Sequence, residues 1–354
     1  RRSSPDIETL AAYVRSILQT QCHWFIVDDL NHLKRGGRVS ATAAFVGTML
    51  GIKPVMHTDS EGRLIPMSKA RGTKAALKAL VDKVEELGVE PDKNQPLFIC
   101  HANCPDSVAY VKELLEERFG VEITDEKLRE SIHILNQERS QMAQLYELGK
   151  LDPPAATGLQ MRSVLTAEYF MLDKKNKLEK TERMLKLMRE QWEAGKGPYR
   201  PDQHPLRILV SGAGIDGVVD KTLGVIEELG AAIVCYEGCC GIMNMRRPID
   251  ESSEADPMMA IADKYLEVPC AVMSPNTRRF EQLRSTLAEW KVDGVISITV
   301  HACTPFDVES KTIGDICAEE GVPFLHVRTD YSPGDEGQLR TRIEAFLEML
   351  EGGR

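Results

Sequence analysis

The C-terminal half of the chain alternates short, continuous apolar runs with helical segments. Residues 295–300 (VISITV) form a β-branched run without polar alternation, which predicts a parallel strand buried on both faces. A helical pattern follows over 305–320 and ends before Gly321 and Pro323, and a second apolar run occupies 324–327. This is a strand–helix–strand unit whose carboxyl edge is where open α/β sheets bind ligands.

The same alternation begins at residue 207 and continues to the last helix. The expected strands are 207–210, 231–236 and 270–273, and the expected helices are 217–229, 256–266, 277–290 and 338–350. We therefore predict an α/β protein with a Rossmann-like, doubly wound parallel sheet in this half.

The first 205 residues carry a different pattern. Strands are expected at 24–27 and 97–100, a hairpin at 52–57 and 63–67, and helices at 7–18, 40–50, 73–87 and 105–119. Three further helices, at 125–148, 159–171 and 175–193, precede a proline-rich linker at 197–205. We expect three domains: residues 1–122, a helical region with linker at 123–205, and a Rossmann-like domain at 206–354.

The net charge, the hydropathy and the cysteine count argue against several classes of protein. A net charge of −10 argues against a nucleic-acid-binding protein, which would need a basic face. The sequence has no apolar run of about 18 residues and no signal-peptide pattern, so we expect a cytoplasmic protein without a membrane span. The nine cysteines are an odd number, which favours free thiols or metal ligands over a disulfide framework.

The loop after the first predicted strand of the sheet is rich in glycine. Gly212, Gly214 and Gly217 satisfy the G-x-G-x-x-G pattern, and Glu237 follows at the end of the next strand. Such a loop with a distant acid is typical of dinucleotide binding, where the acid binds the ribose. The alternative is a glycine-rich turn of a doubly wound domain that binds no nucleotide.

Cysteines gather at the same predicted edge of the sheet. Cys239 and Cys240 follow one parallel strand and Cys303 follows another, so the three thiols can converge. Soft thiolates at a strand edge suit an iron–sulfur cluster, although adjacent cysteines rarely both bind one metal and buried free cysteines are common. Cys235 and Cys317 lie inside apolar segments and are expected in the core.

Residues 6–120 resemble the C-terminal lobe of the DegV family of fatty-acid-binding proteins, through FIVDDLNHLKRGGRVSATAAFVGTMLGIKPVMHTDSEGRLIPMSKARGTKAALKALVDKV and LFICHANCPDSVAYVKELLEERFG. The resemblance implies a pocket for a fatty acid and a fatty acid kinase as partner. It points to Arg38, Ser40 and His57 as lipid-binding residues. The family's carboxylate-holding N-terminal lobe is not in this sequence. A solvated basic loop and a structural histidine are the alternatives for Arg38 and His57.

A second resemblance covers residues 114–350. ILVSGAGIDGVVDKTLGVIEELGAAIVCYEGCCGIMN, VDGVISITVHACTPFDVES and TDYSPGDEGQLRTRIEAFLEML resemble the C-terminal half of the 2-hydroxyacyl-CoA dehydratase and benzoyl-CoA reductase family, nearest its double-cubane branch. Cys303 matches the family's last cluster cysteine, and Cys239 and Cys270 match cysteines of that branch. Ala213 and Val272 stand where that branch usually has cysteine. The family's glycine loop is not a dinucleotide site.

This second resemblance implies an iron–sulfur cluster, which accepts single electrons from an ATP-dependent activator. The family's N-terminal lobe, which carries its other cluster cysteines, is replaced here by the DegV-like segment. We therefore expect a dehydratase-like or reductase-like protein that is an incomplete catalyst alone. The expected partners are the activator or a second dehydratase subunit, and we expect a dimer. The alternative function is a DegV-type fatty-acid-binding protein.

Overall fold

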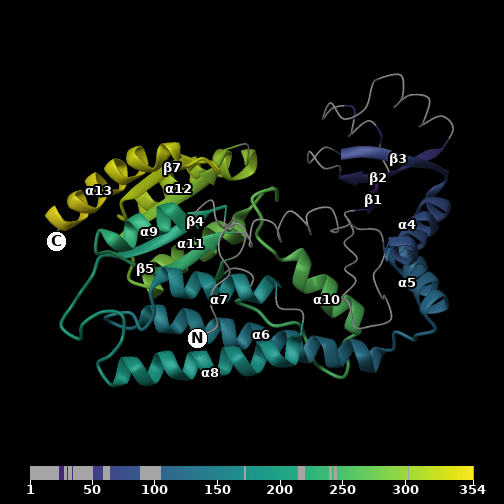
Figure 1. Ribbon diagram of the computed structural model, residues 1–354, viewed down its shortest axis with the longest axis horizontal. Coiled ribbons are helices and arrows are strands. Elements are labelled where there is room, and N and C mark those ends of the chain that lie inside the picture. Colours follow the sequence, from purple (N-terminus) through teal and green to yellow (C-terminus); the bar gives the residue numbers. More distant parts are fainter. Residues whose placement is uncertain are drawn as a thin grey trace, which may run out of the picture. The chain divides into compact units, whose positions relative to one another are not determined.

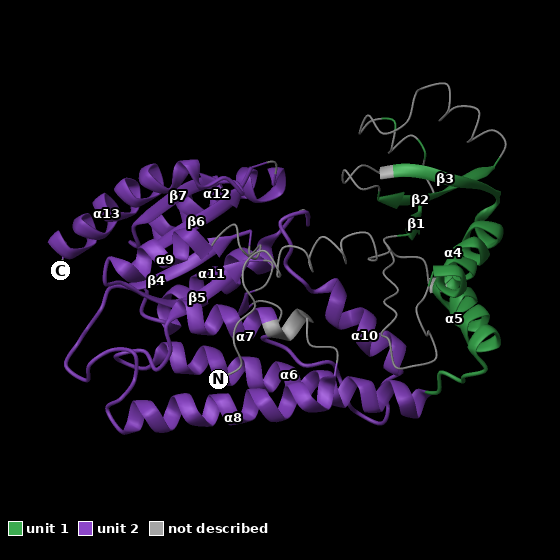
Figure 2. Cartoon of the chain, viewed as in Figure 1, with its two compact units in different colours: residues 1–124 green, residues 125–354 purple. Residues whose placement is uncertain are grey.

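The computed structural model divides the chain into two compact units, residues 1–124 and 125–354 (Figures 1 and 2). It describes residues 24–27, 30, 34, 51–58, 64–87, 105–170, 173–213, 220–238, 241–242, 245–273, 275–301 and 303–353.

The first unit contains a three-stranded antiparallel sheet with the order β1-β2-β3. Its strands and helices are β1 Trp24–Ile26, β2 Ile52–Thr58, β3 Leu64–Arg71, α4 Thr73–Leu87 and α5 Pro105–Phe119. The predicted hairpin is confirmed, since Thr58 pairs with Leu64 at its closed end. The predicted first helix, the small-residue helix at 40–50 and the strand at 97–100 lie outside the described residues.

The helices α4 and α5 supply a small core to this unit. Leu77 and Val81 of α4 are buried against Val111 and Leu115 of α5. These positions recur at helical spacing, so each helix presents one apolar stripe to the other.

The second unit is built on a four-stranded parallel sheet with the order β5-β4-β6-β7. Its strands are β4 Arg207–Gly212, β5 Ala232–Gly238, β6 Gly294–Val300 and β7 Phe324–Thr329. Every residue of β4 and β6 is buried, as the continuous apolar runs predicted. The predicted α/β fold class is therefore confirmed.

Helices cover both faces of this sheet. The crossover helices are α9 Asp220–Glu228, between β4 and β5, and α12 Thr304–Glu319, between β6 and β7. These two connections run in opposite directions from the centre of the sheet, so right-handed crossovers place the helices on opposite faces. The helix α13 Glu336–Gly352 packs on α9, and α11 Thr277–Glu289 packs on α12.

Three helices that precede the sheet share its core. They are α6 Asp125–Lys150, α7 Gly158–Phe170 and α8 Lys174–Glu193, and Figure 1 shows α6 and α8 running side by side. Leu145, Met161 and Leu185, one from each helix, belong to the same buried cluster as the strands. The buried Arg207 at the start of β4 strengthens the connection. It donates to the carbonyls of Gly149, Leu151 and Trp290 at 2.8–3.0 Å.

One predicted strand is wrong. Residues 270–273 form a turn, in which the Met273 amide donates to the Cys270 carbonyl at 2.9 Å. The apolar run VPCAVM suggested a buried strand, yet Val272 is 68% exposed and Met273 44% exposed. Pro269 also lacks the amide that a central strand needs. The segment instead connects α10 Pro257–Leu266, which packs on α6, to α11.

Within the described segments, no helix combines the length and the apolar character needed to cross a bilayer.

We expect limited proteolysis of the native chain to cut first between Gly120 and Asp125. Residues 121–124 have no regular structure, and the two compact units meet there. In contrast, Tyr199 of the 197–205 segment packs on the core of the second unit. Mass spectrometry of the early fragments is the measurement. A first cut within 197–205 would contradict the predicted boundary and would detach α6–α8 from the sheet.

Candidate functional site

The candidate site lies at the carboxyl edge of the parallel sheet, where the direction of winding reverses. β4 has β5 on one side and β6 on the other, so the reversal falls between β4 and β6. Such a switch point is where open α/β sheets bind ligands. Ala213, which follows β4, is buried there with Val300 and Phe306, and Ala271 and Cys303 are partly buried against the three.

Cys303 lies at the start of α12. Its amide donates to the Val300 carbonyl at 2.9 Å, which closes a tight turn after β6. It is the N-cap residue of α12, and its side chain makes no capping hydrogen bond. The free amides at a helix N-terminus favour a negatively charged group. The partly exposed thiol is therefore available to bind a ligand.

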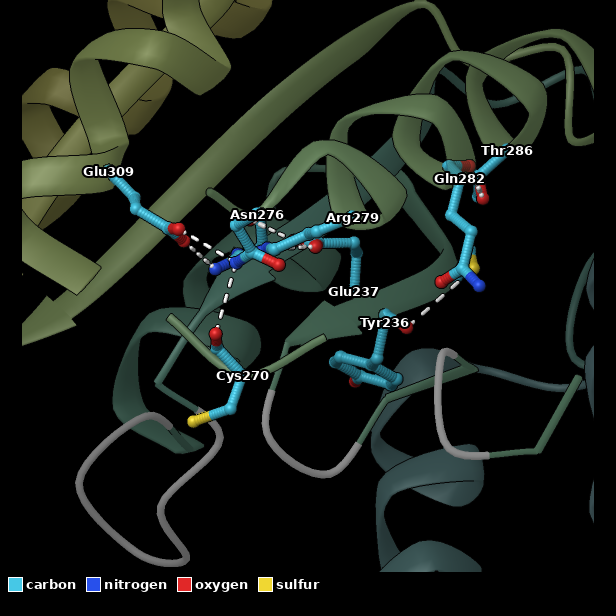
Figure 3. A network of polar contacts seen from close by, with 10 residues as sticks. Tyr236, Glu237, Cys270, Asn276, Arg279, Gln282, Thr286 and Glu309 are labelled. Atoms are coloured by element: carbon cyan, nitrogen blue, oxygen red, sulfur yellow. Dashed lines mark hydrogen bonds and ion pairs between the residues drawn. The ribbon is translucent and has the colours of Figure 1, made fainter. Parts of the chain in front are cut away.

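A buried arginine joins the strands of this edge (Figure 3). Arg279 of α11 donates from Nε to one oxygen of Glu237 at 2.7 Å and from Nη2 to the other at 3.1 Å. The same guanidinium is paired with Glu309 of α12. Arg279 and Glu237 are each 1% exposed at the side chain, and Ser211 at the end of β4 donates to Glu237. One guanidinium therefore connects β5, α11 and α12.

The neighbouring Asn276 extends this network to a second cysteine. Its Nδ2 donates to the Cys270 carbonyl at 3.0 Å and to Glu309 Oε1 at 2.7 Å (Figure 3). The turn that carries Cys270 is thereby fixed to the helix that begins at Cys303. Ala271 and Cys303 contact the same buried cluster, so the two cysteine-bearing segments meet at this edge.

The Arg279 guanidinium also faces the apolar cluster. Its Cζ lies 4.5 Å from the centroid of the Phe306 ring. A cation over an aromatic face is favourable, most of all where water is excluded. Phe306 thus belongs to the cluster that Cys303 contacts and also contacts the buried charge network.

The strand ends leave no room for side chains at two glycines. A Cβ at Gly212 would lie 2.1 Å from the Ile298 carbonyl oxygen, and one at Gly238 would lie 2.1 Å from the Gly212 carbonyl oxygen. Both glycines also have positive φ values, 112° and 145°. The close approach of strands therefore accounts for Gly212.

The dinucleotide hypothesis also needs a ribose-binding acid. Glu237, the residue at the expected position, is buried and bonded to Arg279 and Ser211. Its carboxylate is thus committed to the protein's own network. Gly214 and Gly217 lie outside the described residues.

Of the six predicted site residues, the structure describes two, Cys303 and His57. Cys303 lies at the edge described above, whereas Cys239, Cys240, Arg38 and Ser40 lie outside the described residues. His57 lies on β2, and its ring is stacked on that of Trp24 with centroids 4.6 Å apart. This cross-strand contact gives the ring a packing role.

Two cysteines lie in the core, as expected. Burial raises the pKa of Cys317 to about 12 and raises the pKa of Cys235 well above its usual value. Both thiols stay protonated at neutral pH, which makes them poor metal ligands.

Three residues of this network, Arg279, Asn276 and Glu309, were not predicted from the sequence. A signal for Arg279 was present, because it shares a buried helical stripe with Leu283 and Leu287 at spacings of four and eight. An arginine on an apolar stripe indicates a buried ion pair. Asn276 and Glu309 gave no such signal, because polar residues at helix starts and on helix surfaces are common.

The described residues do not form a complete metal site. Among them, no group of three or more histidine, cysteine, aspartate or glutamate side chains is arranged to hold a metal ion. The described thiols at the edge are those of Cys303 and Cys270. This donor set suits a soft metal but falls short of the four ligands that a cluster normally uses.

Comparison with known proteins gives two matches along the chain. The family model of the 2-hydroxyglutaryl-CoA dehydratase D-component matches residues 101–350. A protein of Escherichia coli K12, YjiM, provisionally described as a dehydratase subunit, is 38% identical over 241 residues, which are 68% of this chain and 61% of that protein.

The family model of DegV matches residues 2–134. A DegV domain-containing protein of Clostridium perfringens is 36% identical over 121 residues, 34% of this chain and 41% of its own length. Another from Lactococcus lactis is 40% identical over 102 residues, 28% of this chain and 34% of its own length. The chain thus spans 61% or less of these relatives, and the composite of two families is confirmed.

We expect Arg279→Met to lower the free energy of unfolding by about 3–5 kcal/mol, because it leaves two carboxylates without their buried partner. Urea denaturation followed by circular dichroism measures this. Arg284→Met is the matched control on the same helix. Its half-exposed pairs with Glu319 and Glu320 should be worth about 0–1 kcal/mol. Equal effects of the two substitutions would contradict a central role for Arg279.

Proposed function

The chain belongs to the 2-hydroxyglutaryl-CoA dehydratase D-component family, and from this we propose that its second unit is the cluster-binding part of an iron–sulfur 2-hydroxyacyl-CoA dehydratase or related low-potential reductase. The observation that carries the proposal is the position of Cys303. A partly exposed thiol at the switch point of the sheet and at a helix N-terminus is suited to bind iron.

The ligands would be Cys303 and one or both of Cys239 and Cys240, and Cys270 lies on the turn that meets the Cys303 segment. Cys239 follows Gly238 directly, and Gly238 is bonded into the end of β5 beside β4. Adjacent cysteines rarely both bind one metal, so we expect two or three thiolates from this edge. When bound, such a cluster supplies single electrons at low potential.

The surrounding residues would set the properties of the site. Arg279, Glu237 and Glu309 hold the cysteine-bearing segments in place, and the buried cluster around Phe306 excludes water from one side. Water exclusion and hydrogen bonds near the sulfurs tune cluster potentials. The substrate would be a coenzyme A thioester. The electron donor would be an ATP-dependent activator, and a second dehydratase subunit would complete the ligand set.

A second candidate function is fatty-acid binding by the first unit, in the manner of the DegV proteins, with a fatty acid kinase as partner. The match at residues 2–134 favours it. Arg38, Ser40 and His57 remain the proposed contacts. We further propose that this unit folds separately as residues 1–122, and that the protein is a cytoplasmic dimer.

We expect anaerobically reconstituted protein to bind less than four irons per chain, with a further fall in Cys303→Ala. The reason is that this edge offers two or three thiolates, and Cys303 is placed best among them. Iron and sulfide analysis, with absorbance near 400 nm, is the measurement.

Cys317→Ala is the control for the iron experiment. It also removes one thiol, but a protonated thiol buried in the core. Iron content should be unchanged in this variant. Four irons per chain that survive Cys303→Ala would contradict both the incomplete site and the role of Cys303.

We expect the chain to bind palmitate weakly, with a dissociation constant above about 1 μM. The matched DegV segment resembles the acyl-tail half of that fold, so a fatty-acid carboxylate would find few hydrogen-bond donors, and burying it with too few donors costs several kcal/mol. Isothermal titration calorimetry measures the affinity. A submicromolar constant would show that the chain holds the carboxylate as well as the tail.

A further inference from the structure

The second unit contains a lysine whose side chain is packed against its neighbours and has no ion-pair partner in the described part of the chain. Lys264, in the last turn of α10, is 4% exposed. Among the described residues, its ammonium group makes no ion pair and no hydrogen bond. Burial lowers the pKa of Lys264, and the nearby Arg139 and Arg247 lower it further. A cation held close to other cations is unfavourable unless an anion lies nearby.

Three arginines gather around this lysine. Arg139 of α6 is 9% exposed, and its guanidinium binds only neutral oxygens among the described residues, Asn136 Oδ1 at 3.1 Å and Tyr265 Oη at 3.3 Å. Arg247 and Arg278 are both paired with Glu267, at 2.9 and 3.1 Å. Four cations thus lie around Glu267, and Arg247 also interacts with Asp250.

An open cavity adjoins the cluster. Arg247 lines a space of about 430 Å³ together with Asn136, Pro248, Ile249, Asp250 and Glu251. Two acids also line it and keep their negative charge: Asp250 accepts from the Ser252 amide, and Glu251 accepts from Asn136. Asn136 also bonds both backbone groups of Ile249, which fixes this loop to α6.

We propose that Lys264, Arg139, Arg247 and Arg278 form an anion site that takes a phosphate group. A phosphate dianion offsets more of the surplus positive charge than a carboxylate does. Its oxygens also match the planar fork of arginine. The phosphate could be free or could belong to coenzyme A.

The position of the cluster favours coenzyme A, and this part of the inference rests on the proposed function. Glu267, which holds two of the arginines, precedes Cys270 by three residues. Three residues span at most about 11 Å between their Cα atoms. Arg278 and Arg279 are consecutive, one paired with Glu267 and the other with Glu237 near the end of β5. Coenzyme A carries phosphates at one end and the thioester at the other, so it can connect the two places.

The test is isothermal titration calorimetry of the full chain, without iron, with inorganic phosphate, coenzyme A and 3′-dephospho-coenzyme A as separate probes. We expect Lys264→Met and Arg247→Met each to weaken coenzyme A binding about tenfold or more, since each removes a charged hydrogen-bond donor. Lys311→Met is the control, because this lysine of α12 is 80% exposed and pairs with Asp315. It should leave the affinity within about twofold of the parent chain.

Each outcome decides the proposal. Tight binding of coenzyme A that is lost with the 3′-phosphate assigns the site to that phosphate. Binding of inorganic phosphate alone, with the same dependence on Lys264 and Arg247, supports the site and assigns it to free phosphate. Unchanged affinity in both variants, or glutarate bound as well as phosphate, would overturn it.

Two features keep the test independent of folding and of the iron site. Arg247 is half-exposed, so its replacement should not unfold the chain, and Lys264→Met should leave the melting temperature about unchanged because it keeps the packed apolar stem and removes a charge that arginines repel. Failure of the iron proposal would appear in metal analysis and would leave the calorimetry unaffected.

Discussion

The edge of the parallel sheet depends on one buried guanidinium. Arg279 is the shared partner of Glu237 and Glu309, and through Asn276 the same helix start holds the Cys270 turn. Without the positive charge, two carboxylates would be confined in a low-dielectric interior, where like charges repel strongly. The Cys270 turn and the helix that Cys303 caps therefore depend on an interaction in which neither cysteine side chain takes part. The buried ion pairs of Arg279 therefore hold in place the segments that carry Cys270 and Cys303.

The sequence predicted much of the fold, because buried parallel strands and amphipathic helices leave periodic apolar patterns. β6, α4 and α5 lie within a residue or so of their expected bounds. The turn at 270–273 was mistaken for a strand, since apolar composition cannot show that Val272 would face solvent. Cys303 could be placed at the edge from chain order alone. The partners of Arg279 could not be predicted. Glu309 and Glu237 are 30 and 42 residues away in the chain, and only the folded structure shows that they pair with this arginine.

The two family matches correspond to two kinds of packing. The first unit has an antiparallel sheet and a small helical core, whereas the second has one large core shared by the parallel sheet and α6–α8. The matches overlap at residues 101–134, which include all of α5 and the start of α6. A helix is a tolerant place for such a junction, since its hydrogen bonds are local and do not depend on which sheet comes before or after it.

The burial of the four described cysteines also determines how readily air oxidises each thiol. Cys235 and Cys317 are sealed in the core as neutral thiols, so oxidants reach them only when the protein opens. Cys303 and Cys270 are partly exposed at the sheet edge, where peroxide or oxygen can convert a thiol to sulfenic acid. Damage during aerobic handling would therefore be concentrated at the edge while the core stays intact. An oxidised sample would keep a normal circular dichroism spectrum and yet have lost the free thiols of Cys303 and Cys270.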